Sequence, residues 1–164
     1  MNSLPPVTRV LLTFLLAVLA SAPAWARVGE PVSEIRKRYG KPQGHPDGRT
    51  MFWMFENDFG AMHYTVTAND KGLSMAEGLK PYRRTRFTAQ DAETFIGMQF
   101  AGYPEANRRT IPPGQAYRFG GQDFVCGAQE HVVVDETAGI LLIWIKSDPG
   151  SVLAVSPEMV QRTK

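Results

Sequence analysis

Residues 61–68 read Ala61-Met62-His63-Tyr64-Thr65-Val66-Thr67-Ala68, and apolar and polar side chains alternate along most of this stretch. Alternation with a period of two is typical of a strand with one face in the core and the other in water. Segments of strand composition flank it at residues 50–56 and 73–79, and short connections rich in Asn, Asp and Gly join them to it. Because such connections are typical of hairpins, the sequence predicts an antiparallel β-meander.

One amphipathic helix is predicted before this meander in the sequence and another after it. Residues 31–39 carry apolar side chains at helical spacing, and Gly40 and a proline follow them, which predicts a helix over this range. A second helix is expected to begin after Thr88, where Asp91 takes the acidic position of a capping box, and to end near residue 100. The apolar face of the first helix can cover the apolar face of the meander.

A second group of strands is predicted in the C-terminal half. Residues 140–145 are apolar on both faces, so we expect them to form the most buried strand. The fold class that follows is α+β, with short helices packed on an antiparallel β-meander. The order of helix then strands occurs twice, which leaves open two tandem units, 27–87 and 88–164, or one domain with one continuous sheet. The strands expected in the C-terminal half are residues 116–119, 123–126, 130–135, 140–146 and 152–155.

The N-terminal 26 residues have the pattern of a secretory signal peptide. Arg9 precedes the apolar run of residues 10–20, and the small-x-small triplet Ala24-Trp25-Ala26 provides a cleavage site before Arg27. The run is shorter than the roughly 18 to 20 residues that cross a bilayer, and no cysteine for lipidation lies near the cleavage site. We therefore expect residues 27–164 to be exported to the periplasm or the extracellular medium, without a lipid anchor or a stable membrane span. An uncleaved N-terminal anchor is the alternative.

The composition argues against other classes of protein. The chain has 18 Lys and Arg residues against 16 Asp and Glu residues, so it lacks the strong basic excess of a nucleic-acid-binding protein. Its one cysteine, Cys126, rules out an intrachain disulfide, so stability must come from packing. We expect no nucleic-acid partner and no cofactor.

Four segments carry a resemblance to known families: residues 34–42, the hairpin ending at 69–72, the strand of 75–79 and the helix of 88–100. Through them the chain resembles small exported bacterial proteins of unknown function, which implies no activity. More distantly, a helix ending in Tyr-Gly-Lys-Pro before an aromatic-rich hairpin is similar to the small α/β modules of outer-membrane assembly lipoproteins and β-lactamase inhibitor proteins. Those families bind other proteins. The chain departs from the lipoproteins in lacking a lipidation cysteine and from the disulfide-bonded inhibitors in having one cysteine.

Catalytic chemistry has one candidate, a thiol-dependent enzyme that uses Cys126 with His131, five residues away, or with His63. The alternative is that Cys126 shares a strand face with Phe124 and acts as a small apolar residue, which leaves no catalytic residue. Its thiol could also form a disulfide between two copies of the chain. The histidines, His45 among them, lack the spacing of zinc ligands, so no metal site is expected.

Two segments are candidates for binding. Residues 51–55 are apolar on both faces, so either both faces are covered or one presents Phe52 or Trp53 to a partner. The basic stretch 80–86 is a solvated linker or a site for an anionic envelope polymer or an acidic partner. Its candidate contact residues are Tyr82, Arg83, Arg84 and Arg86.

The leading hypothesis is a non-enzymatic exported protein that acts through surface contacts with another envelope or extracellular protein. The rivals are the thiol-dependent enzyme and a module that binds anionic polymers through residues 80–86.

Overall fold

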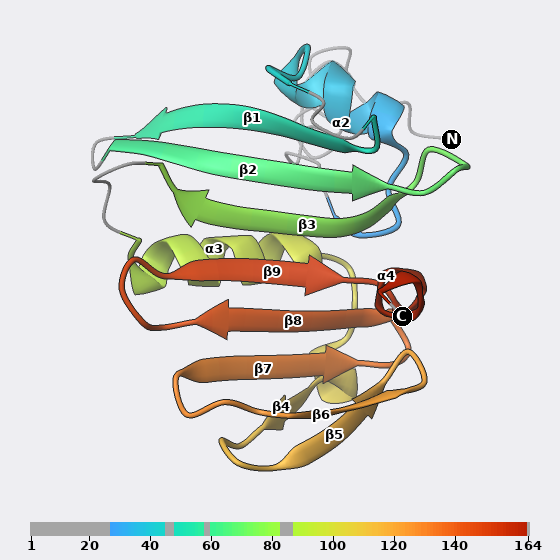
Figure 1. Ribbon diagram of the computed structural model, residues 1–164, viewed down its shortest axis with the longest axis vertical. Coiled ribbons are helices and arrows are strands. Elements are labelled where there is room, and N and C mark those ends of the chain that lie inside the picture. Colours follow the sequence, from blue (N-terminus) through green and yellow to red (C-terminus); the bar gives the residue numbers. More distant parts are fainter. Residues whose placement is uncertain (1–26, 45–47, 58–59, 83–86, 164) are drawn as a thin grey trace, which may run out of the picture.

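The computed structural model describes residues 27–44, 48–57, 60–82 and 87–163. Its main sheet has seven strands in the order β1-β2-β3-β9-β8-β7-β4, and β5 and β6 form a separate hairpin (Figure 1). The strands are β1 (Thr50–Asn57), β2 (Gly60–Ala68), β3 (Ser74–Pro81), β4 (Arg109–Ile111), β5 (Ala116–Phe119), β6 (Gln122–Val125), β7 (Glu130–Asp135), β8 (Ile140–Ile145) and β9 (Ser151–Val155). The helices are α2 (Val32–Tyr39), α3 (Ala89–Gln99), the short 3₁₀-helix η1 (Glu105–Asn107) and α4 (Pro157–Arg162). The fold is α+β, as predicted.

The N-terminal meander has the expected strands. In β2 the apolar positions from Met62 to Ala68 are buried at every second residue, while His63 and the threonines between them are half-buried. Tyr64 lies opposite Trp53 of β1 on one side and opposite Leu79 of β3 on the other. The period of two therefore predicted both the strand and its buried face.

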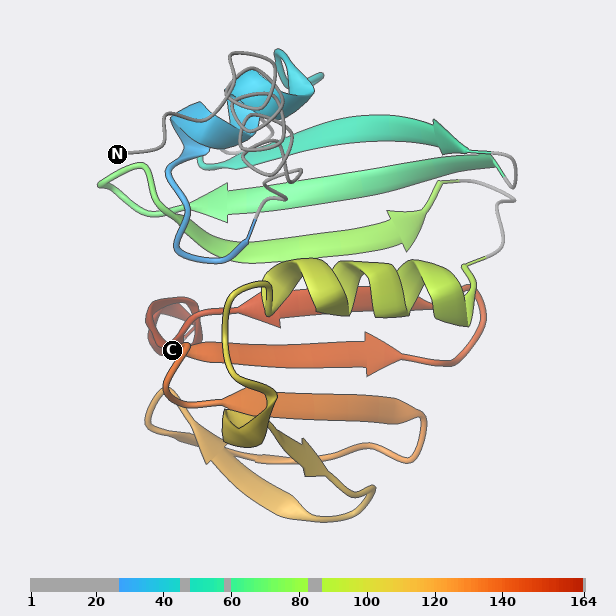
Figure 2. The same ribbon diagram turned by 180° about the vertical axis from the view of Figure 1, so that it is seen from behind.

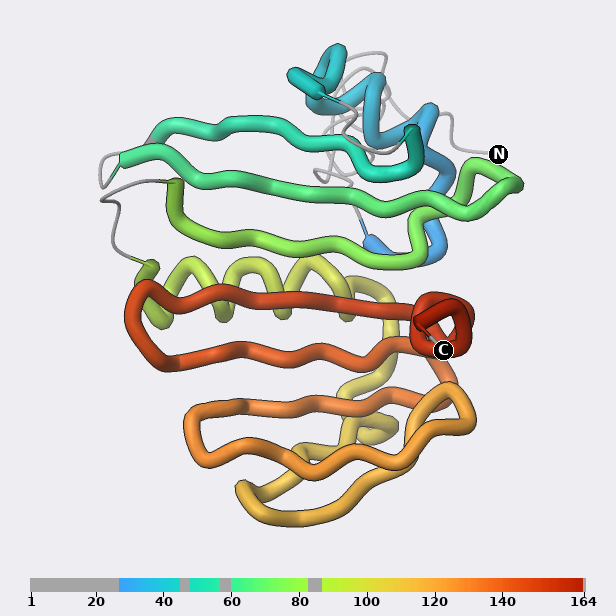
Figure 3. The backbone as a smooth tube through the Cα atoms, in the orientation of Figure 1, coloured from blue at the N-terminus to red at the C-terminus, as the bar shows by residue number. Residues whose placement is uncertain are grey.

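The sheet is continuous through both halves of the sequence. Strands β7, β8 and β9 form a second antiparallel meander, and β9 pairs with β3 in antiparallel fashion, with Gly78 opposite Leu153. The last strand of one meander thus adjoins the last strand of the other, and each meander follows a helix in the chain (Figure 3). The structure thus has one continuous sheet of seven strands.

Helices α2 and α3 cover one face of the sheet, and Figure 2 shows α3 lying along β9 in front of the sheet. Ile35 of α2 and Phe95 of α3 have no exposed surface and join one core with Tyr64 and Leu142. The predicted capping box at Thr88 is present. We call this side of the sheet the helix face.

The opposite face is covered over its C-terminal part. The β5–β6 hairpin and α4 pack there against β7, β8 and β9, and Tyr117, Phe119 and Val160 are among the buried residues that seal it. The sequence analysis did not predict α4 or the three-residue strand β4. The prediction that residues 140–145 form the most buried strand was also wrong. The covering elements stop short of the end of β8, so Ile140 is fully buried but Ile145 is 38% exposed.

Candidate functional site

The sheet face opposite α2 and α3 carries accessible apolar side chains where the hairpin and α4 do not reach. By register, one row across five neighbouring strands consists of Phe52, Thr65, Gly78, Leu153 and Ile143. Figure 1 looks onto this row, with α3 behind the sheet and no described element drawn in front of β1, β2 and β3. We call this region, from β1 to the far end of β8, the open face.

A second row lies beside the first. Met54 of β1, His63 of β2 and Lys80 of β3 are neighbours by register, and Ile145 of β8 continues the same side of the sheet. Tyr82 adds a ring 6.5 Å from that of His63, between centroids. Tyr82, Leu153 and Ile145 are 41%, 40% and 38% exposed, among the largest exposures of large apolar residues in the described chain. Adjoining exposed apolar side chains of this kind typically mark a contact surface.

A glycine, Gly78, lies in the middle of β3 on the open face, and side chains from the two neighbouring strands pack close to it. A Cβ atom at Gly78 would lie 3.0 Å from Oγ1 of Thr65 and 3.6 Å from Cδ1 of Leu153. Glycine inside a strand weakens the strand, and it often marks a place where another backbone or a ligand approaches closely. Leu153, whose side chain packs beside Gly78, is one of the exposed residues.

Burial keeps the ring of His63 neutral. Desolvation, and then the nearby ammonium of Lys80, lower the pKa of His63 below its usual 6.5. Its ring lies 4.8 Å from that of Phe52, between centroids, and its Nδ1 atom is buried without a hydrogen-bond partner among the described residues. At neutral pH, Lys80 is therefore the cation within the second row.

The predicted contact residues fall on different sides of the sheet. Phe52 is half-buried on the open face, where Gly44 packs so closely on its ring that a Cβ atom there would overlap it. Trp53 was the wrong choice, because it is 3% exposed on the helix face and its indole N–H donates to the Gly40 carbonyl at 3.1 Å. Tyr82 is exposed, as expected of a contact residue. Arg83, Arg84 and Arg86, like His45 and the predicted signal peptide, lie outside the described residues.

Cys126 and His131 do not form a catalytic pair. Cys126 is 1% exposed, and it packs with Val132 and Val134 beneath the β5–β6 hairpin. His131 alternates with Val132 along β7, so it points to the helix face, where its ring lies 6.0 Å from that of Trp144. Burial, and then the charge of Glu130, raise the pKa of the Cys126 thiol above its usual value. The thiolate that a nucleophile needs is thus disfavoured.

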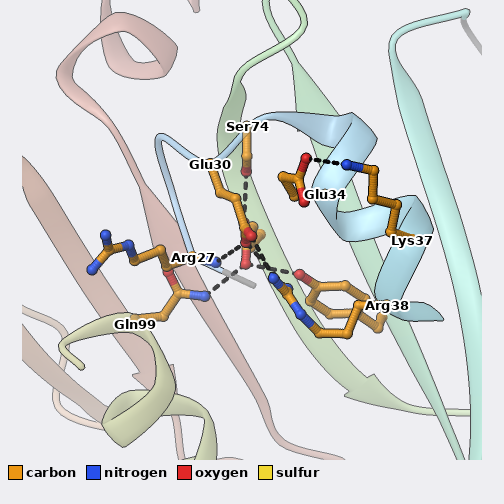
Figure 4. A network of polar contacts seen from close by, with 9 residues as sticks. Arg27, Glu30, Glu34, Lys37, Arg38, Ser74 and Gln99 are labelled. Atoms are coloured by element: carbon orange, nitrogen blue, oxygen red, sulfur yellow. Dashed lines mark hydrogen bonds and ion pairs between the residues drawn. The ribbon is translucent and has the colours of Figure 1, made fainter. Parts of the chain in front are cut away.

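A buried carboxyl group on the helix face escaped the sequence analysis. Glu77 of β3 has no exposed surface and accepts hydrogen bonds from Tyr64 Oη at 2.8 Å, Ser74 Oγ at 2.8 Å and Gln99 Nε2 at 2.7 Å (Figure 4). Burial raises its pKa, although these hydrogen bonds oppose the shift. The hydrogen bonds of Glu77 thus connect β2, β3 and α3. The sequence held a signal for it, because Glu77 alternates with the apolar Met75 and Leu79 in a strand.

A smaller recess lies between α3, the end of α2 and the helix face of the sheet. It has a volume of about 390 Å³ and is lined mainly by apolar side chains, among them Tyr39, Phe55, Met62, Leu79 and Met98. Its size is at the lower end of the range for small-molecule pockets. The open face differs from it in being an extended surface rather than an enclosed space.

The described residues contain neither a metal-binding cluster nor a membrane-spanning helix. No group of three or more His, Cys, Asp or Glu side chains within them could hold a metal ion. None of the helices in the described part of the chain is long and apolar enough to cross a membrane.

Comparison with known proteins assigns no family. No family model matches the chain, and no curated protein matches it. Among solved structures, the chain is similar to a cysteine-rich secretory protein from Staphylococcus aureus subsp. aureus Mu50, with 14% sequence identity and a TM-score of 0.46. The match covers 81% of this chain but only 44% of that protein, so the chain spans less than half the length of its structural neighbour.

Proposed function

We propose that this chain is an exported protein that binds another envelope or extracellular protein through its open face. The observation that carries the proposal is the contrast between the two faces of the sheet. Helices α2 and α3 cover the helix face apart from the recess between them, whereas no helix covers Leu153, Ile145 and Tyr82, which remain accessible on the open face. Covering apolar surface of this kind is the main favourable term in protein association.

Export is supported by the N-terminal sequence. The apolar run and the small-x-small triplet precede Arg27, and Val28, the next residue, is already in the core with 7% exposure. A chain cleaved before Arg27 would keep every element of the sheet. This part of the proposal is independent of the open face.

The shape of the open face favours a macromolecule over a small ligand. Its first row crosses five strands, which at about 4.8 Å between neighbours spans roughly 19 Å. Small ligands are bound in concave pockets that surround them, whereas extended surfaces with an apolar centre and a polar rim are typical of protein interfaces.

Lys80 indicates the chemistry of the partner. Lys80 is exposed, and its strand β3 lies between β2, where the half-buried His63 is its partner in register, and β9, the strand that carries Leu153. A partner segment with an apolar side chain against Leu153 and a carboxylate opposite Lys80 would match both residues. A rim charge of this kind acts mainly on specificity and on the rate of association.

Site-specific photo-crosslinking in the exporting cell tests the proposal. A photoreactive amino acid at Leu153 is expected to yield one discrete adduct with another exported protein, and the Lys80→Glu variant is expected to weaken that adduct. The matched control is Val125, which is 65% exposed on the β5–β6 hairpin, away from the open face. Equal labelling from both positions, no adduct, or an adduct only with a second copy of the chain would contradict the proposal.

Charge reversal at a remote lysine separates a specific contact from a general effect of charge. Lys71 lies exposed in the turn between β2 and β3, at the other end of these strands from Lys80. The Lys71→Glu variant is expected to leave the adduct at its original yield. If both reversals weaken it equally, Lys80 has no specific role in recognition.

A further inference from the structure

The first described residues are fixed to a distant part of the chain. The Arg27 guanidinium donates to the carbonyl oxygen of Ala101 at 2.9 Å, and it lies over the Tyr103 ring, 5.2 Å from the centroid. The Val28 amide donates to Oε1 of Gln99 at 2.9 Å. Arg27, the residue that follows the predicted cleavage site, is therefore held in place together with Val28.

The backbone nitrogen of Arg27 faces a carboxylate. It donates to Oε2 of Glu30 at 3.3 Å, and the guanidinium of Arg38 donates to both oxygens of the same carboxylate. Figure 4 shows Arg27 and Arg38 on either side of Glu30. The side chains of Arg38 and Glu30 are only 20% and 15% exposed. Glu30 is thus a sheltered acidic group with one cation beside it and the Arg27 nitrogen on another side.

We infer that cleavage before Arg27 creates a structural cation, the α-ammonium group of Arg27, which pairs with Glu30 in the mature protein. The inference rests on the proposed export. In the reaction, a signal peptidase hydrolyses the Ala26–Arg27 bond, so that one water molecule supplies the hydroxyl of the new Ala26 carboxyl group and a hydrogen for the Arg27 nitrogen. At neutral pH the new amine is largely protonated.

The position of the cut decides whether this pair forms. One additional residue would move the ammonium group about 3.8 Å along the chain and leave an ordinary amide at the Arg27 nitrogen. A hydrogen bond between charged groups is roughly twice as strong as a neutral one, although the exposure of Arg27 reduces the gain. The residue after Arg27 also contacts Gln99: the Val28 amide donates to the Gln99 side chain, which in turn donates to Glu77.

The test measures the pKa of the α-amino group by NMR in the processed protein, after mass spectrometry has established its first residue. The pKa is expected to lie about half a unit or more above the usual 7.7–8.0, which corresponds to at least about threefold in the folding equilibrium. Because the pKa of the α-amino group is raised in the folded state, the gain in folding stability is fully present below about pH 7.7. It is lost as the pH rises through the folded-state pKa.

Variants separate the Glu30 contact from other effects. Glu30→Gln should return the α-amino pKa to its usual range, whereas Glu34→Gln, which removes an exposed partner of Lys37, should not change it. If Glu30→Gln does not fold, a processed chain with one additional alanine before Arg27 gives the same comparison. A usual pKa in the unaltered protein, or no response to these changes, would overturn the inference.

The starting residue distinguishes the two proposals. An exported protein that starts elsewhere than Arg27 contradicts the inference and leaves export and the open face intact. An unprocessed chain that stays in the cytoplasm contradicts the export on which both proposals rest.

Discussion

At the scale of single residues, the buried carboxyl group of Glu77 is the least expected feature of the chain. An ionised carboxylate without a cation is costly to bury, and Glu77 meets this cost with the three donors Tyr64, Ser74 and Gln99. The alternation of the sequence places Glu77 on the buried side of β3, but its partner on α3 is 22 residues away and follows from no local pattern. The sequence could therefore indicate its burial but not its network.

Glu77→Gln should remove part of the pH dependence of stability. A glutamine can keep the network, because its carbonyl oxygen can accept from Tyr64 and Gln99 while its amide donates to the Ser74 hydroxyl. The pKa of Glu77 is raised in the folded state, so the folded protein binds the proton more tightly and wild-type stability falls as the pH rises from about 4 through the folded-state pKa. Urea denaturation from pH 4 to 8 should show that the free energy of unfolding of the variant rises relative to that of the wild type as the pH increases. A constant difference between them would refute this role for Glu77.

The Cys126 thiol should be unreactive in the native protein. It is buried under the β5–β6 hairpin, its pKa is raised, and His131 is on the other face of the sheet. An alkylating reagent should therefore modify it no faster than the protein unfolds, and urea should accelerate the reaction. Rapid modification of the folded protein would contradict the buried position and revive a thiol-dependent activity.

At the scale of elements, local signals predicted the segments that carry them and missed those that do not. The strand predictions at 116–119 and 130–135 coincide with β5 and β7, and the capping box marked the start of α3. Helix α4 begins with Ser156 as its N-cap followed by Pro157, but its six residues are too few to show helical periodicity. Strand β4 has three residues and is specified by its pairing with β7.

Thr88→Ala should destabilise the protein by about 1 kcal/mol through the start of α3. The Thr88 hydroxyl accepts from the Asp91 amide at 3.2 Å, and the Asp91 carboxylate accepts from the Thr88 amide at 2.8 Å, so the variant loses the first of these bonds. Thr94→Ala, at an exposed position inside the same helix, should be neutral or slightly stabilising. The measurement is the free energy of unfolding of both variants, and equal losses would show that the cap contributes nothing.

At the scale of the whole molecule, the pairing of β3 with β9 turns two meanders into one sheet. This pairing joins residues more than 70 positions apart, such as Gly78 and Leu153, and neither strand carries a local signal for it. For the same reason the sequence could not show which face would remain open. The side chains of residues 51–55 are apolar in both directions, and only the positions of α2 and α3 place Trp53 inside and Phe52 outside.

The two halves should unfold together. The processed chain would have two tryptophans, Trp53 in the N-terminal half and Trp144 in the C-terminal half. In the single-tryptophan variants Trp53→Phe and Trp144→Phe, the fluorescence midpoint in urea should coincide with the midpoint from circular dichroism of the same variant. Separate midpoints in either variant would mean that the halves are independent domains.

The most direct test of recognition through the open face is the affinity of the crosslinked partner for two matched variants. Leu153→Lys places a charge beside Gly78 on the open face, while Val125→Lys places the same charge on the β5–β6 hairpin. Because a few central residues carry most of the energy of an interface, Leu153→Lys should weaken binding at least about tenfold, or about 1.4 kcal/mol. Val125→Lys should leave the affinity unchanged. Equal affinities for both variants, with both proteins folded, would contradict binding at the open face.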